Sequence, residues 1–164
     1  MSDANYWPYF WMYRFQHNDT IRSVNFPDLK NVFSMNHTFE QCSNLKEAHF
    51  DSLSSVSFLQ SAFRDCPSLT AVTFSELVNI GGNGMQYTFQ DSVGLSSVAF
   101  PKLTTAGNNA FTQAFYGCSA LTSVTFPELS NITTALFTNC FVGTGVRSLS
   151  FPKATTIATF RTAS

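Results

Sequence analysis

Cysteine and histidine are the side chains of this sequence best suited to metal binding or catalysis. The chain has four cysteines and three histidines, and structural zinc sites normally take their cysteine ligands in close Cys-x-x-Cys pairs. Cys42, Cys66, Cys118 and Cys140 are separated by 24, 52 and 22 residues, so no such pair exists. We expect no metal site and no cofactor.

The histidines lie in the N-terminal third, and one of them has a carboxylate two residues away. His49 follows Glu47, and residues two apart on a strand point to the same face. Catalysis by His49 would also need a nucleophile and an orienting partner. We interpret the two as an ordinary solvated pair and predict that the protein has no catalytic residues and is not an enzyme.

A glycine-rich stretch, residues 81–84, resembles a phosphate-binding loop only in its glycine content. It lacks the Lys-Ser/Thr ending that such a loop uses to reach phosphate and metal. We interpret it as a turn that absorbs two extra residues in its part of the chain.

Composition limits the kinds of partner. Only 12% of the residues are charged and the net charge is -1, which gives no attraction to nucleic acid or to an anionic membrane. No run approaches the ~18 apolar residues of a membrane span, so we expect no membrane insertion. The first residues do not have the pattern of a signal peptide. A surface built from Ser, Thr and Asn suits contact with a protein or a glycan.

The strongest pattern is a repeat with a period of 24 to 26 residues. Apolar residues recur in the order apolar-x-x-apolar-x-Phe, and this spacing predicts a short strand with alternating faces. The six segments are Ile21–Phe26, Leu45–Phe50, Leu69–Phe74, Leu95–Phe100, Leu121–Phe126 and Val146–Phe151. Such a period is typical of a leucine-rich repeat.

The repeat continues beyond each strand and explains why the chain has 18 phenylalanines. A second phenylalanine comes later in each unit, as Phe39, Phe63, Phe89, Phe115, Phe137 and Phe160. Three residues later stand Cys42, Cys66, Ser92, Cys118, Cys140 and Ala163. A single unit cannot bury its apolar edge, whereas stacked units bury continuous columns. The cysteines therefore fit best as buried thiols, with disulfides between neighbouring units and metal binding as weaker alternatives.

We predict a leucine-rich-repeat solenoid of about six units, with a parallel sheet on its concave face and short helical or irregular convex segments. Residues 1–20 are expected to form an aromatic half-repeat or cap. Residues 21–164 are expected to form the solenoid, with units starting near 21, 45, 69, 95, 121 and 146.

Residues 111–127 in particular resemble the BspA-type leucine-rich repeat, and the resemblance covers nearly the whole chain. It implies a protein found outside the cell, on a cell surface or in a virion, because relatives are surface proteins and adhesins and similar repeats occur in predicted phage tail proteins. It also implies binding of a protein or glycan surface without catalysis.

The outward positions of the strands form the expected binding surface. Small hydroxyl side chains dominate there, and only the first two units add charge or histidine. The candidate residues are Ser23, Asn25, Glu47, His49, Thr73, Ser97, Ser123 and Thr125.

Both ends of the chain suggest an alternative, in which the protein is a structural subunit assembled through the solenoid ends as a homo-oligomer or a larger particle. The N-terminal end is rich in aromatic residues, and the last unit is expected to leave a strand edge uncovered. The candidate end-interface residues are Tyr6, Trp7, Tyr9, Phe10, Trp11, Leu149, Phe151 and Phe160.

Overall fold

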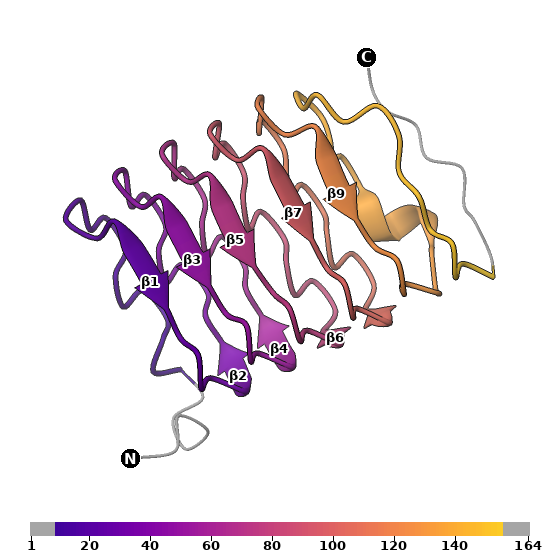
Figure 1. The fold of residues 1–164 in the computed structure, drawn as a ribbon, viewed down its shortest axis with the longest axis horizontal. Coiled ribbons are helices and arrows are strands. Elements are labelled where there is room, and N and C mark those ends of the chain that lie inside the picture. Colours follow the sequence, from indigo (N-terminus) through magenta and orange to yellow (C-terminus); the bar gives the residue numbers. More distant parts are fainter. Residues whose placement is uncertain (1–8, 156–164) are drawn as a thin grey trace.

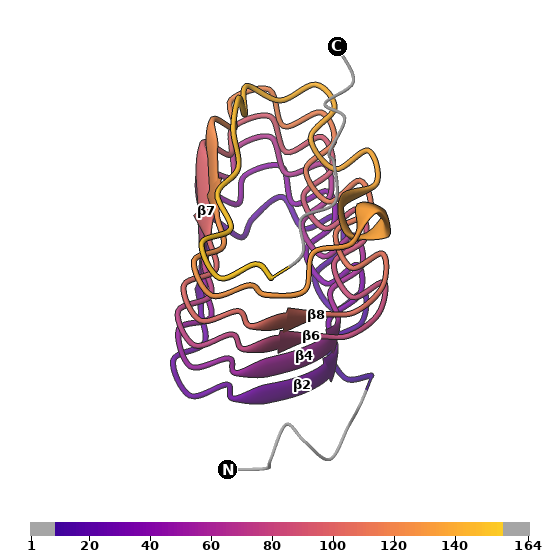
Figure 2. The same ribbon diagram turned by 90° about the vertical axis from the view of Figure 1, so that its right-hand side faces the viewer.

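The computed structural model describes residues 9–155, which wind into a parallel β-solenoid (Figures 1 and 2). Each turn adds one strand to a five-stranded sheet with the order β1-β3-β5-β7-β9, all parallel. These strands are β1 (Ser23–Asn25), β3 (Glu47–His49), β5 (Ala71–Thr73), β7 (Ser97–Ala99) and β9 (Ser123–Thr125). The predicted leucine-rich-repeat solenoid is confirmed.

The repeat spacing sets the register of this sheet. Val24 pairs with Ala48, and Ala48 pairs with Val72, so that residues of the same repeat position lie next to one another. From β3 to β9 the central residue of each strand is buried, whereas both flanking residues are exposed or partly exposed. Alternation with period two therefore gives one face to the core and one to solvent.

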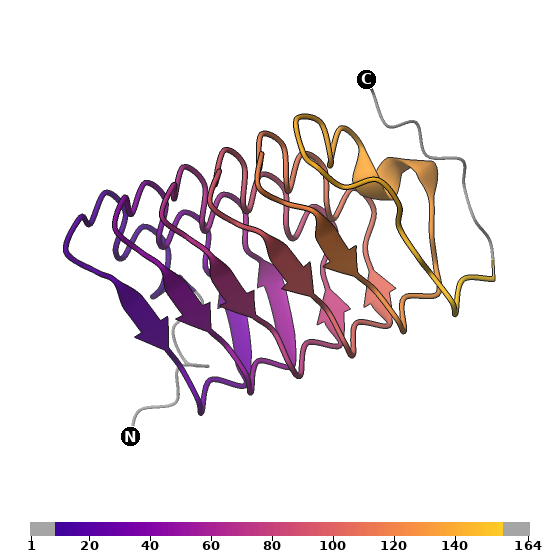
Figure 3. The same ribbon diagram turned by 45° about the horizontal axis from the view of Figure 1, so that its top comes forward.

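A second parallel sheet, which the sequence analysis did not predict, lies next to the first along the solenoid (Figure 3). It has the order β2-β4-β6-β8, with β2 (Asn31–Ser34), β4 (Ser55–Phe58), β6 (Asn79–Ile80) and β8 (Thr105–Ala106). Its buried column is Val32, Val56, Ile80 and Ala106. These residues stand at one regularly spaced apolar position of the repeat, where no strand was predicted.

The third side of each turn, here called the turn wall, comprises residues 11–17, 35–41, 59–65, 83–91, 109–117 and 137–143. Short helical or irregular segments were expected on this side, and within the described residues the only helix is a 3-10 turn, η2 (Thr134–Phe137). The wall instead has a residue with positive φ at every fourth position, for example Tyr13, His17, His37 and Gln41. Between residues 13 and 117, every second N–H of the wall donates to a carbonyl of the next turn, as His37 N does to Gln60 O.

The positive φ values explain the difference between the 24-residue and the 26-residue units. Units with 24 residues have two left-handed positions in the wall, whereas the 26-residue units add a third at Asn83 and Asn109. Residues 81–84 therefore do form the turn that absorbs the two extra residues. Left-handed backbone costs roughly 1–2 kcal/mol for a residue other than glycine, and the hydrogen bonds between turns offset this cost.

The interior is filled by columns of stacked rings, as the phenylalanine excess predicted. One column consists of Phe26, Phe50, Phe74, Phe100, Phe126 and Phe151, with neighbouring centroids 5.2 to 5.7 Å apart. The second consists of Phe15, Phe39, Phe63, Phe89, Phe115 and Phe141, with spacings of 5.2 to 5.8 Å. Rings from Phe39 to Phe115 and from Phe50 to Phe126 are at most 1% exposed.

The prediction of the ring that follows Phe115 in the second column was wrong. It placed Phe137 there, but Phe141 stacks on Phe115 at 5.8 Å, and Phe137 stacks on Phe111 at 5.2 Å. Cys140 consequently leaves the predicted cysteine column, because it directly precedes the ring residue instead of following it by three positions. Phe160, the predicted sixth ring, lies outside the described residues.

The prediction of a sixth strand at Val146–Phe151 was also wrong. Residues 145–150 have no regular secondary structure, although Phe151 still stacks on Phe126. Within residues 145–155, the backbone N–H groups that reach the preceding turn are those of Gly145, to Leu121, and Thr155, to Ser130. The last described segment thus follows the path of the solenoid without joining the five-stranded sheet.

Candidate functional site

The outer face of the five-stranded sheet holds all of the predicted surface residues. Ser23, Asn25 and Glu47 are exposed, and so are Ser97, Ser123 and Thr125, whereas His49 and Thr73 are partly buried. Most of this face is flat and has small uncharged side chains. Charge is concentrated on β3 and on the turn that follows it.

Five polar side chains of two neighbouring turns form one hydrogen-bonded network, here called the sheet-face patch: Glu47, His49, Asp51, Thr73 and Ser75. Thr73 Oγ1 and Ser75 Oγ both donate to Asp51 Oδ1, at 2.8 and 2.7 Å. His49 Nδ1 lies 3.1 Å from Thr73 Oγ1, and His49 Nε2 lies 3.4 Å from Glu47 Oε2.

The two hydroxyls influence the titration of Asp51. Hydrogen bonds from Ser75 and then Thr73 favour the carboxylate and lower the pKa of Asp51, and the nearby His49 acts in the same direction. Asp51 is therefore ionised at neutral pH. Glu47 is also well exposed, with 55% of its side chain accessible.

The order carboxylate, histidine, hydroxyl resembles a catalytic triad, but the hydrogen-bond directions do not suit one. A nucleophilic hydroxyl must give its proton to the histidine, whereas Thr73 gives its proton to Asp51. Thr73 Oγ1 can then only accept a hydrogen bond from His49 Nδ1. This geometry favours a role in binding rather than in catalysis.

A second polar cluster, on the turn wall, holds adjacent turns together. Glu40 is only 7% exposed and accepts from Gln16 Nε2 at 2.6 Å, while His37 Nδ1 lies 2.8 Å from the same Glu40 oxygen. Arg64 Nη1 is 3.7 Å from the other oxygen, and Tyr13 stacks on His37 at 4.7 Å. Because Tyr13 and Gln16 belong to the first half-unit, the cluster joins this half-unit to the next two turns.

The four cysteines are free and buried. Cys42, Cys66 and Cys118 donate to the carbonyls of Phe15, Phe39 and Phe89, and Ser92 does the same to Phe63. Burial raises the pKa of Cys66 and of Cys118 to about 12, and it also raises the pKa of Cys42 and Cys140. Cys42, Cys66 and Cys118 are therefore structural hydrogen-bond donors, and burial disfavours the reactive thiolate in all four cysteines.

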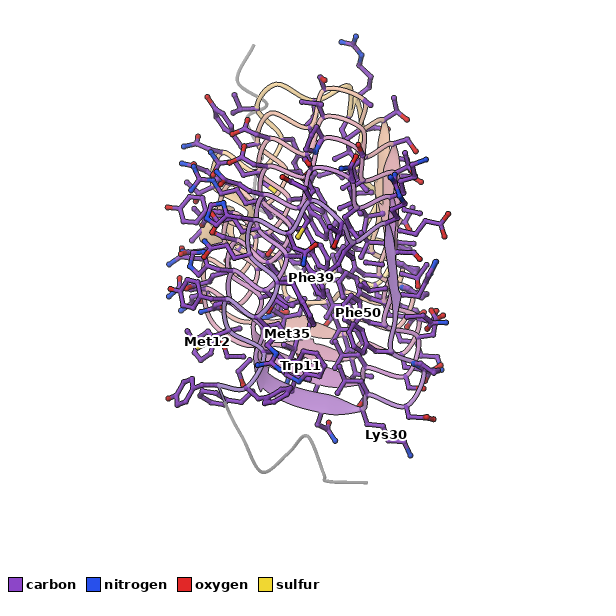
Figure 4. All side chains as sticks on the ribbon, turned by 90° about the vertical axis from the view of Figure 1, so that its left-hand side faces the viewer. Trp11, Met12, Lys30, Met35, Phe39 and Phe50 are labelled. Atoms are coloured by element: carbon purple, nitrogen blue, oxygen red, sulfur yellow. The ribbon has the colours of Figure 1, made fainter. Side chains whose placement is uncertain are left out.

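The predicted end-interface residues differ in exposure. At the N-terminal end Tyr9 and Phe10 are 63% and 47% exposed. Trp11 is partly buried and lies at the end of the interior, in front of the layers that contain Met35, Phe39 and Phe50 (Figure 4). At the other end Leu149 and Phe151 pack partly buried against the core. Tyr6, Trp7 and Phe160 lie outside the described residues.

Residues 9–155 hold neither a metal-binding cluster nor a helix suited to span a membrane. No three or more His, Cys, Asp or Glu side chains come together in a way that could hold a metal ion. No helix in this part of the chain has the length and hydropathy needed to cross a membrane.

The coiled parallel sheets and stacked apolar columns define a repeat solenoid. The model of a family described as BspA type leucine rich repeat region matches six copies, over residues 10–114 and 112–160. The chain belongs to the BspA-type leucine-rich-repeat family. This family is in general a non-catalytic repeat scaffold.

Among solved structures, the chain is similar to a leucine rich cell surface protein from Faecalibacterium prausnitzii A2-165. The TM-score is 0.57 and the identity 23%, over 79% of this chain and 32% of that protein. At this identity the similarity shows the fold. This chain thus spans about a third of the length of that protein. The comparison with curated proteins found no match.

Glu47 and His49 were predicted from the sequence as surface residues, whereas Asp51 and Ser75 were not predicted as members of the same patch. A signal was present, because proline follows the strand in four units, whereas these two residues replace it in neighbouring units. Recognising it required knowing that the two turn positions lie side by side.

Proposed function

We propose that this chain is a non-catalytic binding module of a surface protein, which recognises a protein or glycan surface through the outer face of the five-stranded sheet. The observation that carries the proposal is the sheet-face patch. It places four departures from the repeat pattern, Glu47, His49, Asp51 and Ser75, together on an exposed face. The family and the cell-surface protein with the same fold support display outside the cell.

A binding screen tests this function. The folded chain is applied to arrays of glycans and of extracellular proteins, with the core variant Phe115→Ala as a control for nonspecific capture by poorly folded material. The proposal expects at least one array member that retains the wild type and not the control. Equal retention of both, or retention of neither, would contradict it.

The exposed aromatic side chains at the N-terminal end favour a second candidate, a structural subunit that assembles through this end in a cell-surface layer or a virion. Tyr9, Phe10, Tyr13 and Phe33 are 44% to 63% exposed, and exposed apolar patches mark interaction sites. Size exclusion with light scattering tests this candidate. A multimer that Phe10→Ser converts to a monomer supports assembly, whereas a monomeric wild type contradicts it.

A further inference from the structure

Comparison of equivalent positions in the six repeat units shows which residues the fold requires and which residues depart from the repeat. In five of the six units the two outward strand positions are small or uncharged, as in Ser97 and Ala99, whereas one unit has Glu47 and His49. The following turn position is proline in four units and Asp51 or Ser75 in the other two. Packing does not demand these residues, because Glu47 and Asp51 are exposed.

The hydrogen bonds leave the patch rich in acceptors. The hydroxyl protons of Thr73 and Ser75 both go to Asp51 Oδ1. Within the described chain, Asp51 Oδ2 and Glu47 Oε1 have no hydrogen-bond or ion-pair partner. The patch therefore offers two negatively charged acceptors, and a matching ligand must supply donors. Charged N–H donors make the stronger hydrogen bonds to carboxylates.

No lysine or arginine of the described residues pairs with these two carboxylates. Lys46 and Arg22 are exposed at the starts of neighbouring strands, but neither makes an ion pair with Glu47 or Asp51 among residues 9–155. The sheet beyond the patch is uncharged from β5 to β9, so a second surface can approach closely. No aromatic side chain of the described strands faces outward here for a sugar ring to stack on, which favours a protein over a glycan.

We propose that the sheet-face patch binds an arginine or lysine side chain of a protein partner, between Glu47 and Asp51. The proposal rests on the binding function proposed above and names the chemistry of the partner. His49 lies beside both carboxylate positions of the patch, with Nε2 3.4 Å from Glu47 Oε2 and Nδ1 3.1 Å from Thr73 Oγ1, so its ring reports on an occupant of the patch.

The test uses a fluorescent hexa-arginine peptide and, as a neutral peptide of similar shape, hexa-citrulline. Binding to the full chain is followed by fluorescence anisotropy at low and at physiological salt. The patch variant is Glu47→Gln with Asp51→Asn. Its matched control is Glu76→Gln with Glu128→Gln, which removes the same charge from two exposed residues outside the patch. NMR spectra record whether the His49 ring signals shift on binding.

The expected result is that hexa-arginine binds the wild type, shifts the His49 signals and binds the patch variant roughly tenfold or more weakly. The control variant changes affinity less than about twofold, as for charges outside an interface. Equal weakening in both variants would show diffuse attraction and overturn the proposal, as would no binding to the wild type. If a partner found on the arrays binds the patch variant as well as the wild type, the binding function stands and this inference fails.

Discussion

The interior columns and the outer face of the five-stranded sheet are built from the same repeat, yet they tolerate change differently. Inside, each ring is sandwiched between equivalent rings of the neighbouring turns, as Phe89 is between Phe63 and Phe115. Outside, Ser97 and Ala99 meet solvent on a strand whose neighbour carries Thr73. The interior therefore fixes residue type at each position, whereas the outer face can acquire a binding site without disturbing the fold.

The largest expected effect comes from removing one ring of the interior. Phe115 is fully buried and stacks on Phe89 and Phe141. Phe115→Ala should lower the free energy of unfolding by about 3–5 kcal/mol, because the cavity cannot close between stacked turns. Urea denaturation measures this, with the exposed Phe33→Ala as the control. Equal stability of Phe115→Ala and wild type would show that Phe115 is not part of the core.

The buried thiols give the next largest effect, at alkaline pH. The folded pKa of Cys66 and Cys118 is about 12, above the value of an unfolded thiol, so their contribution to stability is complete below that value and is lost as the pH rises. Between about pH 8 and pH 10 the free energy of unfolding should fall by roughly 1–2 kcal/mol per thiol. Cys118→Ser should reduce this fall, as judged by urea denaturation at both pH values. An unchanged pH dependence would contradict burial of that thiol.

A smaller effect is expected on the turn wall. Gly117 has a φ of 74°, and an added Cβ would collide with Asp91 Oδ1. Gly117→Ala should therefore cost about 1–2 kcal/mol. The matched change Gly82→Ala meets no atom closer than 3.7 Å at a position without positive φ, so it should be nearly neutral. Thermal melts that rank the two variants in the opposite order would refute the left-handed geometry at Gly117.

The smallest effect belongs to the outer face. Hydrogen bonds from Ser75 and Thr73 lower the pKa of Asp51 in the folded state. The carboxylate then stabilises the fold above its unfolded pKa of about 3.9, and this contribution disappears as the pH falls through the folded pKa. The stability difference between wild type and Asp51→Asn should be small at pH 6 and should vanish near pH 2. A difference that grows toward acid would contradict the network.

Most of the solenoid could be predicted because each interior column consists of the same residue type at equivalent repeat positions, which can be seen in the sequence. The five-stranded sheet followed from the alternation around Val72, Val98 and Val124. The second sheet was missed because its strands have only two to four residues and one regularly spaced apolar position. Phe137 was misplaced because it and Phe141 are four residues apart, which is the spacing of two neighbouring columns of the turn wall.

The candidate site was less predictable than the fold. Glu47 and His49 could be assigned to one face from their spacing of two residues. The contacts of Asp51 with Thr73 and Ser75 join residues that are 22 and 24 positions apart. They depend on the register between turns, which the sequence defines only after the repeat has been folded into a solenoid.

The most direct test of the account measures stability and binding on the same variant. Glu47→Gln with Asp51→Asn should unfold in urea within about 1 kcal/mol of the wild type, as expected for exposed polar changes, while it binds the hexa-arginine peptide roughly tenfold or more weakly. That result would show that the interior columns stabilise the fold and that the sheet-face patch binds the peptide. Retained binding by this well-folded variant would contradict the account.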